Sequence, residues 1–65
     1  MTIIDDDSKV REIESLKKIV HKHKDIEGND IFEDFVEVMI VGKERKWMQY
    51  YPLNHFVKLN PAVEF

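Results

Sequence analysis

Residues 35–51, FVEVMIVGKERKWMQYY, hold two apolar segments separated by a short polar one. The first segment, from Phe35 to Val41, is rich in β-branched residues, which restrict the side chain and favour strands. Gly42 follows it and marks a turn that carries several cations. An aromatic segment comes directly after the turn. We therefore predict an antiparallel β-hairpin whose tip is the basic cluster.

The length of the turn decides which residues of the hairpin face each other. A two-residue or a four-residue turn around Lys43 and Glu44 gives the same pairing. That pairing sets Val41 opposite Lys46, Ile40 opposite Trp47, Val38 opposite Gln49 and Val36 opposite Tyr51. The predicted core face then consists of Val36, Val38, Ile40, Trp47 and Tyr51. A turn with an odd number of residues would instead place Met48 and Tyr50 on the core face.

The segment before the hairpin, residues 5–24, has apolar side chains at spacings of three and four. These are Val10, Ile13, Leu16, Ile19 and Val20. Such spacing predicts one apolar face of an α-helix. We expect Asp6, Asp7 or Ser8 to cap the start of this helix and Gly28 to end it. The apolar face is predicted to cover the hairpin; a helix-to-helix dimer contact is the alternative.

The last residues are broken by two prolines. Pro52 is expected to end the second hairpin strand, because proline has no N–H to donate to a sheet. Residues 55–59, HFVKL, fit either a third short strand or one helical turn. We thus predict an α+β fold, one small domain over residues 1–65: an N-terminal amphipathic helix packed on an antiparallel β-hairpin with a third short strand. The alternative is all-α, with residues 30–51 as one long helix.

Length and composition limit the classes of function. The chain has 65 residues, 43% of them apolar, and no cysteine, so neither a disulfide nor a thiolate metal site can stabilise it. Small domains without such links often gain stability from a partner chain, and we expect a homodimer. No signal segment or membrane-spanning segment is visible, which predicts a cytoplasmic protein with no membrane partner.

No group of residues predicts catalysis or a cofactor. A cysteine nucleophile is absent, and two isolated glycines cannot form a phosphate-binding loop. His21, His23 and His55 are the only metal-like grouping, but helical residues two positions apart point in different directions. The acidic run Asp5–Asp7 fits a helix cap better than a calcium loop. We predict a protein that is not an enzyme, with no catalytic residue, metal or cofactor.

The charges come in blocks of alternating sign within a net charge of −3. Residues 9–24 hold six Lys or Arg and two Glu, and residues 25–37 hold six acids and no cation. The simpler interpretation is that the basic and acidic blocks lie beside each other within one chain. The alternative is that one block steers a partner of opposite charge.

These observations predict a small protein-interaction module that regulates or inhibits a larger protein. The second face of the hairpin is apolar for a solvent face, and Met and Tyr are adaptable side chains common at interfaces. The predicted interface is Met39, Val41, Met48 and Tyr50, with Lys43, Arg45 and Lys46 at its rim. The alternative is a single-stranded nucleic-acid-binding protein, because cations beside aromatic rings contact phosphates and stack on bases.

Overall fold

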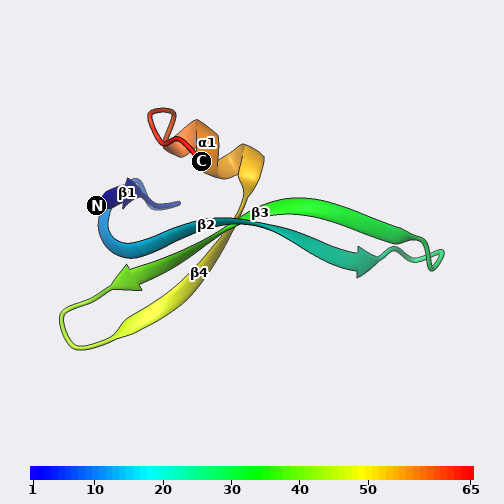
Figure 1. Cartoon of the computed structure of the whole chain (residues 1–65), viewed down its shortest axis with the longest axis horizontal. Coiled ribbons are helices and arrows are strands. Elements are labelled where there is room, and N and C mark those ends of the chain that lie inside the picture. Colours follow the sequence, from blue (N-terminus) through cyan, green and yellow to red (C-terminus); the bar gives the residue numbers. More distant parts are fainter.

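The computed structural model describes residues 1–65 as an antiparallel sheet followed by one short helix (Figure 1). Its elements are β1 (Thr2–Ile4), β2 (Val10–Lys24), β3 (Asp30–Val41), β4 (Lys46–Pro52) and α1 (Leu53–Leu59). The strands lie in the order β1-β2-β3-β4, so each strand pairs with its neighbour in the sequence. Strands make up 57% of the residues and helix 11%, so the protein is mainly β.

The predicted N-terminal amphipathic helix is wrong, and so is the all-α alternative: residues 10–24 form β2. A register shift between Ile13 and Ser15 explains the misleading spacing. Ile13 pairs with Ile40 and Leu16 with Val38, so two residues three positions apart face the same side of the sheet. A bulge adds one residue to a strand and thereby replaces a spacing of two by three. The bulge accounts for the spacing of Ile13 and Leu16, whereas Ile19 lies on the other face of the sheet.

The prediction for the hairpin is confirmed in its register. β3 and β4 pair with Ile40 opposite Trp47, Val38 opposite Gln49 and Val36 opposite Tyr51. The Gly42 N–H donates a hydrogen bond to the Arg45 carbonyl at 2.8 Å, which closes the turn. β4 extends to Pro52, as predicted for a residue that cannot donate to a ladder.

The core lies on one side of the sheet, under α1. Its seven buried apolar residues are Ile3, Ile13, Val36, Val38, Ile40, Tyr51 and Phe56, and Trp47 packs against them. Residues 53–59 form a helix, so the third short strand predicted there is wrong and the helical alternative is right. Phe56 is the one residue of α1 in the core, and the terminal Phe65 ring lies 6.0 Å from it.

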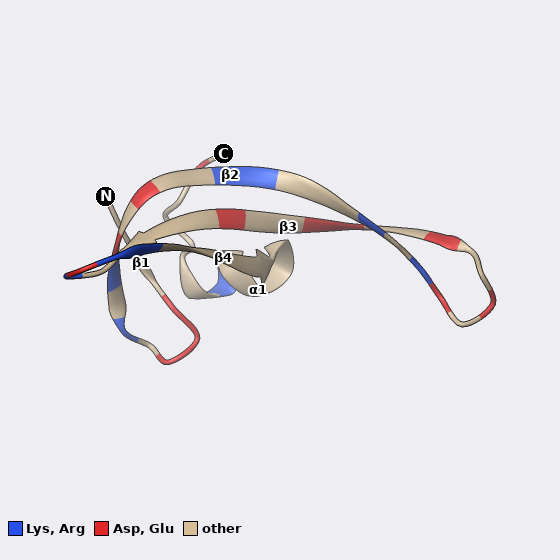
Figure 2. Ribbon diagram, turned by 90° about the horizontal axis from the view of Figure 1, so that it is seen from below, with Lys and Arg blue, Asp and Glu red and all other residues tan.

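The pairing of β4 with β3 ends at Phe35. From there toward the turn at residues 25–29, β2 and β3 continue without β4 as a two-stranded arm (Figure 1). Lysines on β2 lie beside acidic residues on β3, as Figure 2 shows by colour. Lys22 and Lys24 each approach the Asp30 carboxylate at 3.8 Å. The basic and acidic blocks of the sequence therefore face each other within one chain, as the simpler interpretation predicts.

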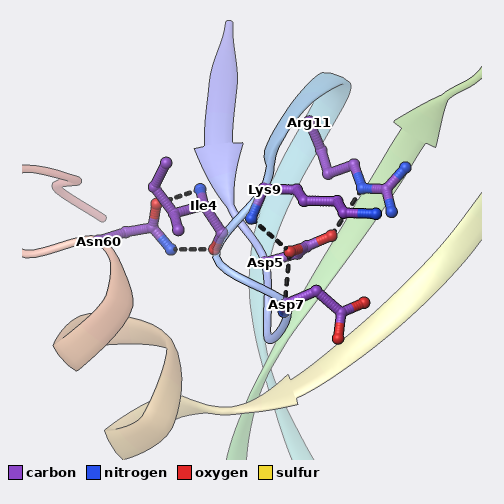
Figure 3. A network of polar contacts seen from close by, with 6 residues as sticks. All are labelled: Ile4, Asp5, Asp7, Lys9, Arg11 and Asn60. Atoms are coloured by element: carbon purple, nitrogen blue, oxygen red, sulfur yellow. Dashed lines mark hydrogen bonds and ion pairs between the residues drawn. The ribbon is translucent and has the colours of Figure 1, made fainter.

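The two turns that flank β2 are built alike, each from five residues that begin with an aspartate. The carboxylates of Asp5 and Asp25 each accept two backbone N–H groups, from the third and fifth residues of the turn, at 2.9 Å (Figure 3 for Asp5). The fourth residue, Ser8 or Gly28, has a positive φ of 62° or 85°. This is the geometry of a type I turn followed by a left-handed residue. Hence the acidic run and Gly28 form hairpin turns, and their predicted roles as helix cap and helix end are wrong.

Acidification is expected to destabilise the protein partly through Asp5. The Arg11 guanidinium, 2.6 Å away, and the Lys9 N–H hold the pKa of the Asp5 carboxyl below its ordinary value of 3.8. A lowered folded-state pKa stabilises the fold above about pH 4, and the contribution is lost as pH falls through that pKa. Asp5→Asn should therefore lower the unfolding free energy at neutral pH and flatten its decline below about pH 4, measured by urea titration at each pH.

Asp25 provides the matched comparison for this experiment. Hydrogen bonds led by the Asn29 N–H lower its pKa as well, so part of the acid dependence should remain in Asp5→Asn. Asp25→Asn should remove that remaining part when the two substitutions are combined. If the decline of the unfolding free energy below about pH 4 is unchanged in Asp5→Asn, the ion pair of Asp5 with Arg11 does not make stability depend on pH.

Candidate functional site

Where β2, β3 and β4 lie together, the core and α1 cover one side of the sheet and no element covers the other (Figure 1). Side chains alternate along each strand, and paired residues share a face. The bare side, which we call the open face, consists of Ser15, Lys17, Ile19, His21 and His23 on β2, Ile31, Glu33, Phe35, Glu37, Met39 and Val41 on β3, and Lys46, Met48 and Tyr50 on β4.

The structure brings five of the seven predicted interface residues together on the open face. Met39 and Met48 are cross-strand partners, and Val41 is the partner of Lys46. Tyr50 lies next to this group, opposite Glu37 on β3. Met48 and Tyr50 are 40% and 49% exposed, and their apolar surface is accessible to a partner. The predicted apolar centre of the interface is thus continuous across two strands.

The three predicted rim cations do not form a free basic cluster. Lys46 Nζ lies 2.8 Å from the Glu14 carboxylate, which comes from the bulge in β2. Arg45 is in the turn, and its guanidinium lies 5.5 Å from the centre of the Trp47 ring, in the geometry of a cation–π contact. Lys43 is exposed in the same turn. Two of the three cations are therefore already engaged within the chain.

A groove on the open face was not predicted from the sequence. Its volume is about 420 Å³, and it is lined by Ile19, His21, Phe35, Glu37 and Tyr50. The prediction placed Ile19 and His21 on a helix, so their pairing with β3 was not visible. The alternation of His21 and His23 with Lys22 and Lys24 is the signal that could have located this strand.

The histidines of β2 point to the same side of the sheet. The rings of His21 and His23 stack with their centres 5.5 Å apart. The rings of His21 and Phe35 meet edge to face, with their centres 5.6 Å apart. His23 Nε2 lies 2.7 Å from the Glu33 carboxylate. The prediction that His21 and His23 point in different directions is wrong, because residues two apart share a face in a strand. No group of three or more His, Cys, Asp or Glu residues is arranged to hold a metal ion.

Tyr50 joins the apolar row to the charged part of the open face. The neighbouring Glu37 carboxylate favours the protonated phenol and opposes its ionisation, which raises the pKa of Tyr50 above its ordinary value of 10.0. The phenol is therefore neutral at physiological pH and presents an apolar ring with a polar tip. Such amphipathic side chains suit a surface that is wet when free and buried when bound.

Comparisons with protein families, with curated proteins and with solved structures find no match to this chain. The single helix, α1, has seven residues and does not meet the length and apolarity needed to cross a membrane.

Proposed function

We propose that this chain is a non-enzymatic protein-interaction module that binds a larger protein through its open face and thereby regulates or inhibits it. One observation carries the proposal: the sheet has an apolar row, Met39, Met48 and Tyr50, on the side that α1 leaves bare. An exposed group of apolar side chains surrounded by polar ones is typical of a surface that binds another molecule.

The composition of the open face suits a protein partner. Met and Tyr are enriched at the centres of interfaces, while charged residues form their rims. Here the methionines and Tyr50 are central, and Lys17, Glu33 and Lys46 lie around them.

Charged substitutions in the apolar row should weaken partner binding. Met48→Asp and Tyr50→Asp each place a carboxylate where the proposed interface excludes water, and an unpaired buried charge is costly. We expect at least about a tenfold loss of affinity, which corresponds to about 1.4 kcal/mol. The measurement is affinity capture from lysate with quantitative mass spectrometry, followed by titration of the captured protein.

Val57→Asp is the matched control, because Val57 is an exposed apolar residue of α1, on the covered side of the sheet. A specific partner should be retained by the unmodified chain and by Val57→Asp, and lost from both open-face variants. Circular dichroism checks that every variant remains folded. If Met48→Asp and Tyr50→Asp retain the partner, the open face is not the binding surface.

Single-stranded nucleic acid is the competing ligand. It is disfavoured because Arg45 and Lys46 already contact Trp47 and Glu14 within the chain. A labelled oligonucleotide at low salt separates the two functions. We expect no binding at concentrations of about 10⁻⁵ M, within the range of non-specific DNA binders, about 10⁻⁴–10⁻⁶ M at physiological salt. Binding that is lost in Arg45→Glu and weakens steeply with salt would replace the protein-interaction proposal.

A further inference from the structure

The free edges of the sheet differ in how they are protected. An exposed edge strand can pair with another chain unless it is short, charged or covered. β1 has three residues, and the Asn60 side chain accepts a hydrogen bond from the Ile4 N–H at 2.7 Å and donates one to the Ile4 carbonyl at 2.9 Å (Figure 3). The outer edge of β2 carries Lys17, Lys18, Lys22 and Lys24, and the free end of β3 carries Asp30, Glu33 and Asp34. These three edges are covered or strongly charged.

The edge of β4 has none of these protections. Its seven residues, KWMQYYP, contain one charge, at Lys46, and its proline lies at the far end. None of the backbone hydrogen bonds that lie outside the helix and the strands involves residues 46–52, and the outward N–H and C=O groups of Met48 and Tyr50 have no partner in the chain. β4 is therefore the one strand that offers an uncharged, unpaired edge.

The turn before β4 determines which of its backbone groups point outward. Gly42 and Arg45 are joined by a hydrogen bond, and bonded and non-bonded pairs alternate along an antiparallel ladder. Trp47, Gln49 and Tyr51 therefore direct their N–H and C=O groups toward β3. Met48 and Tyr50 direct theirs toward the free edge.

We propose that two copies of the chain associate by antiparallel pairing of their β4 strands, with the two-fold axis at Gln49. Met48 is then opposite Tyr50 of the second copy, and these residues exchange outward backbone hydrogen bonds. Trp47 is opposite Tyr51 of the second copy, and Gln49 is opposite itself. The four-stranded sheet becomes a continuous sheet of eight strands.

This register follows from the charges and side chains of β4. It places each Lys46 opposite Pro52 of the second copy, at the two ends of the contact, so that the cations are far apart. It also pairs methionine with tyrosine and tryptophan with tyrosine, and cross-strand pairs that include aromatic rings stabilise sheets. The pairing joins the two open faces, but it uses only the edge, so it does not depend on the proposed function.

Disulfide trapping tests both the contact and its register, because the chain has no cysteine of its own. Gln49→Cys should give a disulfide-linked dimer under mild oxidation, since residues in a non-bonded antiparallel pair have Cα atoms about 4.5 Å apart, within disulfide range. Met48→Cys is the matched control: each Cys at 48 is offset from its copy by two residues and should cross-link poorly. Equal cross-linking of the two variants, or none of Gln49→Cys, overturns the proposal.

Charge reversal at the axis tests the contact without a covalent bond. Light scattering on the unmodified chain should show a dimer of the 7.8 kDa protomer that dissociates on dilution. Gln49→Lys and Gln49→Glu should each weaken the dimer at least tenfold, because like charges meet at the axis, and an equimolar mixture should restore it. A monomer at all concentrations overturns the proposal. A dimer whose affinity is unchanged by both Gln49 substitutions but that is lost in Tyr50→Asp also overturns it, because that result would place the contact on the open face.

Discussion

Phe56→Ala should lower the unfolding free energy by about 3–5 kcal/mol, the usual cost of removing a buried phenylalanine side chain. Phe56 is 0% exposed and is the only residue of α1 in the core. Its ring lies 5.8 Å from that of Tyr51, at the end of β4, and 6.0 Å from that of Phe65. Of the other residues of α1, Leu53 is only partly buried where it packs against the core, so Phe56 makes the main apolar contact of the helix with the sheet.

Urea denaturation followed by circular dichroism measures this loss. The control is Val57→Ala, an exposed neighbour on the same helix, which should change the unfolding free energy by less than about 0.5 kcal/mol. Domains typically have only about 5–15 kcal/mol in total, so Phe56→Ala should be largely unfolded near room temperature if the domain lies at the low end. A loss below about 1 kcal/mol would mean that α1 does not contribute to the core.

Asn60→Ala should destabilise the fold by about 1–3 kcal/mol, because it leaves buried polar groups without partners. Asn60 is 7% exposed. Its side-chain amide accepts a hydrogen bond from the Ile4 N–H and donates one to the Ile4 carbonyl. Its own backbone N–H donates to the Phe56 carbonyl at 2.9 Å and closes α1. One residue therefore ends the helix and covers the edge of β1.

Two measurements separate the roles of Asn60. Urea denaturation gives the total loss, and hydrogen exchange at the Ile4 amide reports the contact with β1 directly. The Ile4 amide should exchange faster in Asn60→Ala than in the unmodified chain, even where global unfolding is corrected for. Asn54→Ala, on the exposed start of α1, should leave that amide unchanged. Unchanged exchange at Ile4 in Asn60→Ala would contradict this account of the β1 edge.

The hairpin of β3 and β4 could be predicted because the residues that specify it are adjacent in the sequence. A strand-forming segment, a glycine and an aromatic segment follow one another, and the length of the turn fixes the pairing. β2 could not be predicted in the same way. Its bulge gives Ile13 and Leu16 a helical spacing, and Ile19 and Val20 then fall on opposite faces of the sheet. Without knowledge of the bulge, the spacing of the apolar residues predicts a helix where the structure has a strand.

The error in β2 also limited the prediction of the candidate site. Met39, Met48 and Tyr50 were identified because they lie on the hairpin, whereas Ile19 and His21 reach the same face only through the pairing of β2 with β3. The Asp5 and Asp25 turns do have a local signal, an aspartate three positions before Ser8 or Gly28. The contact of Asn60 with Ile4 has none, because it joins residues 56 positions apart.

The strand order β1-β2-β3-β4 has a consequence for the speed of folding. Every strand pairing in the sheet spans a single short turn, so each hairpin can close without first bringing distant segments together. The contacts that join the two ends of the chain, Asn60 with Ile4 and His55 with Asp6, close much longer loops, because these residues are 56 and 49 positions apart. We therefore expect the sheet to form by successive local steps and the joining of the two ends of the chain to carry the largest loop-closure entropy.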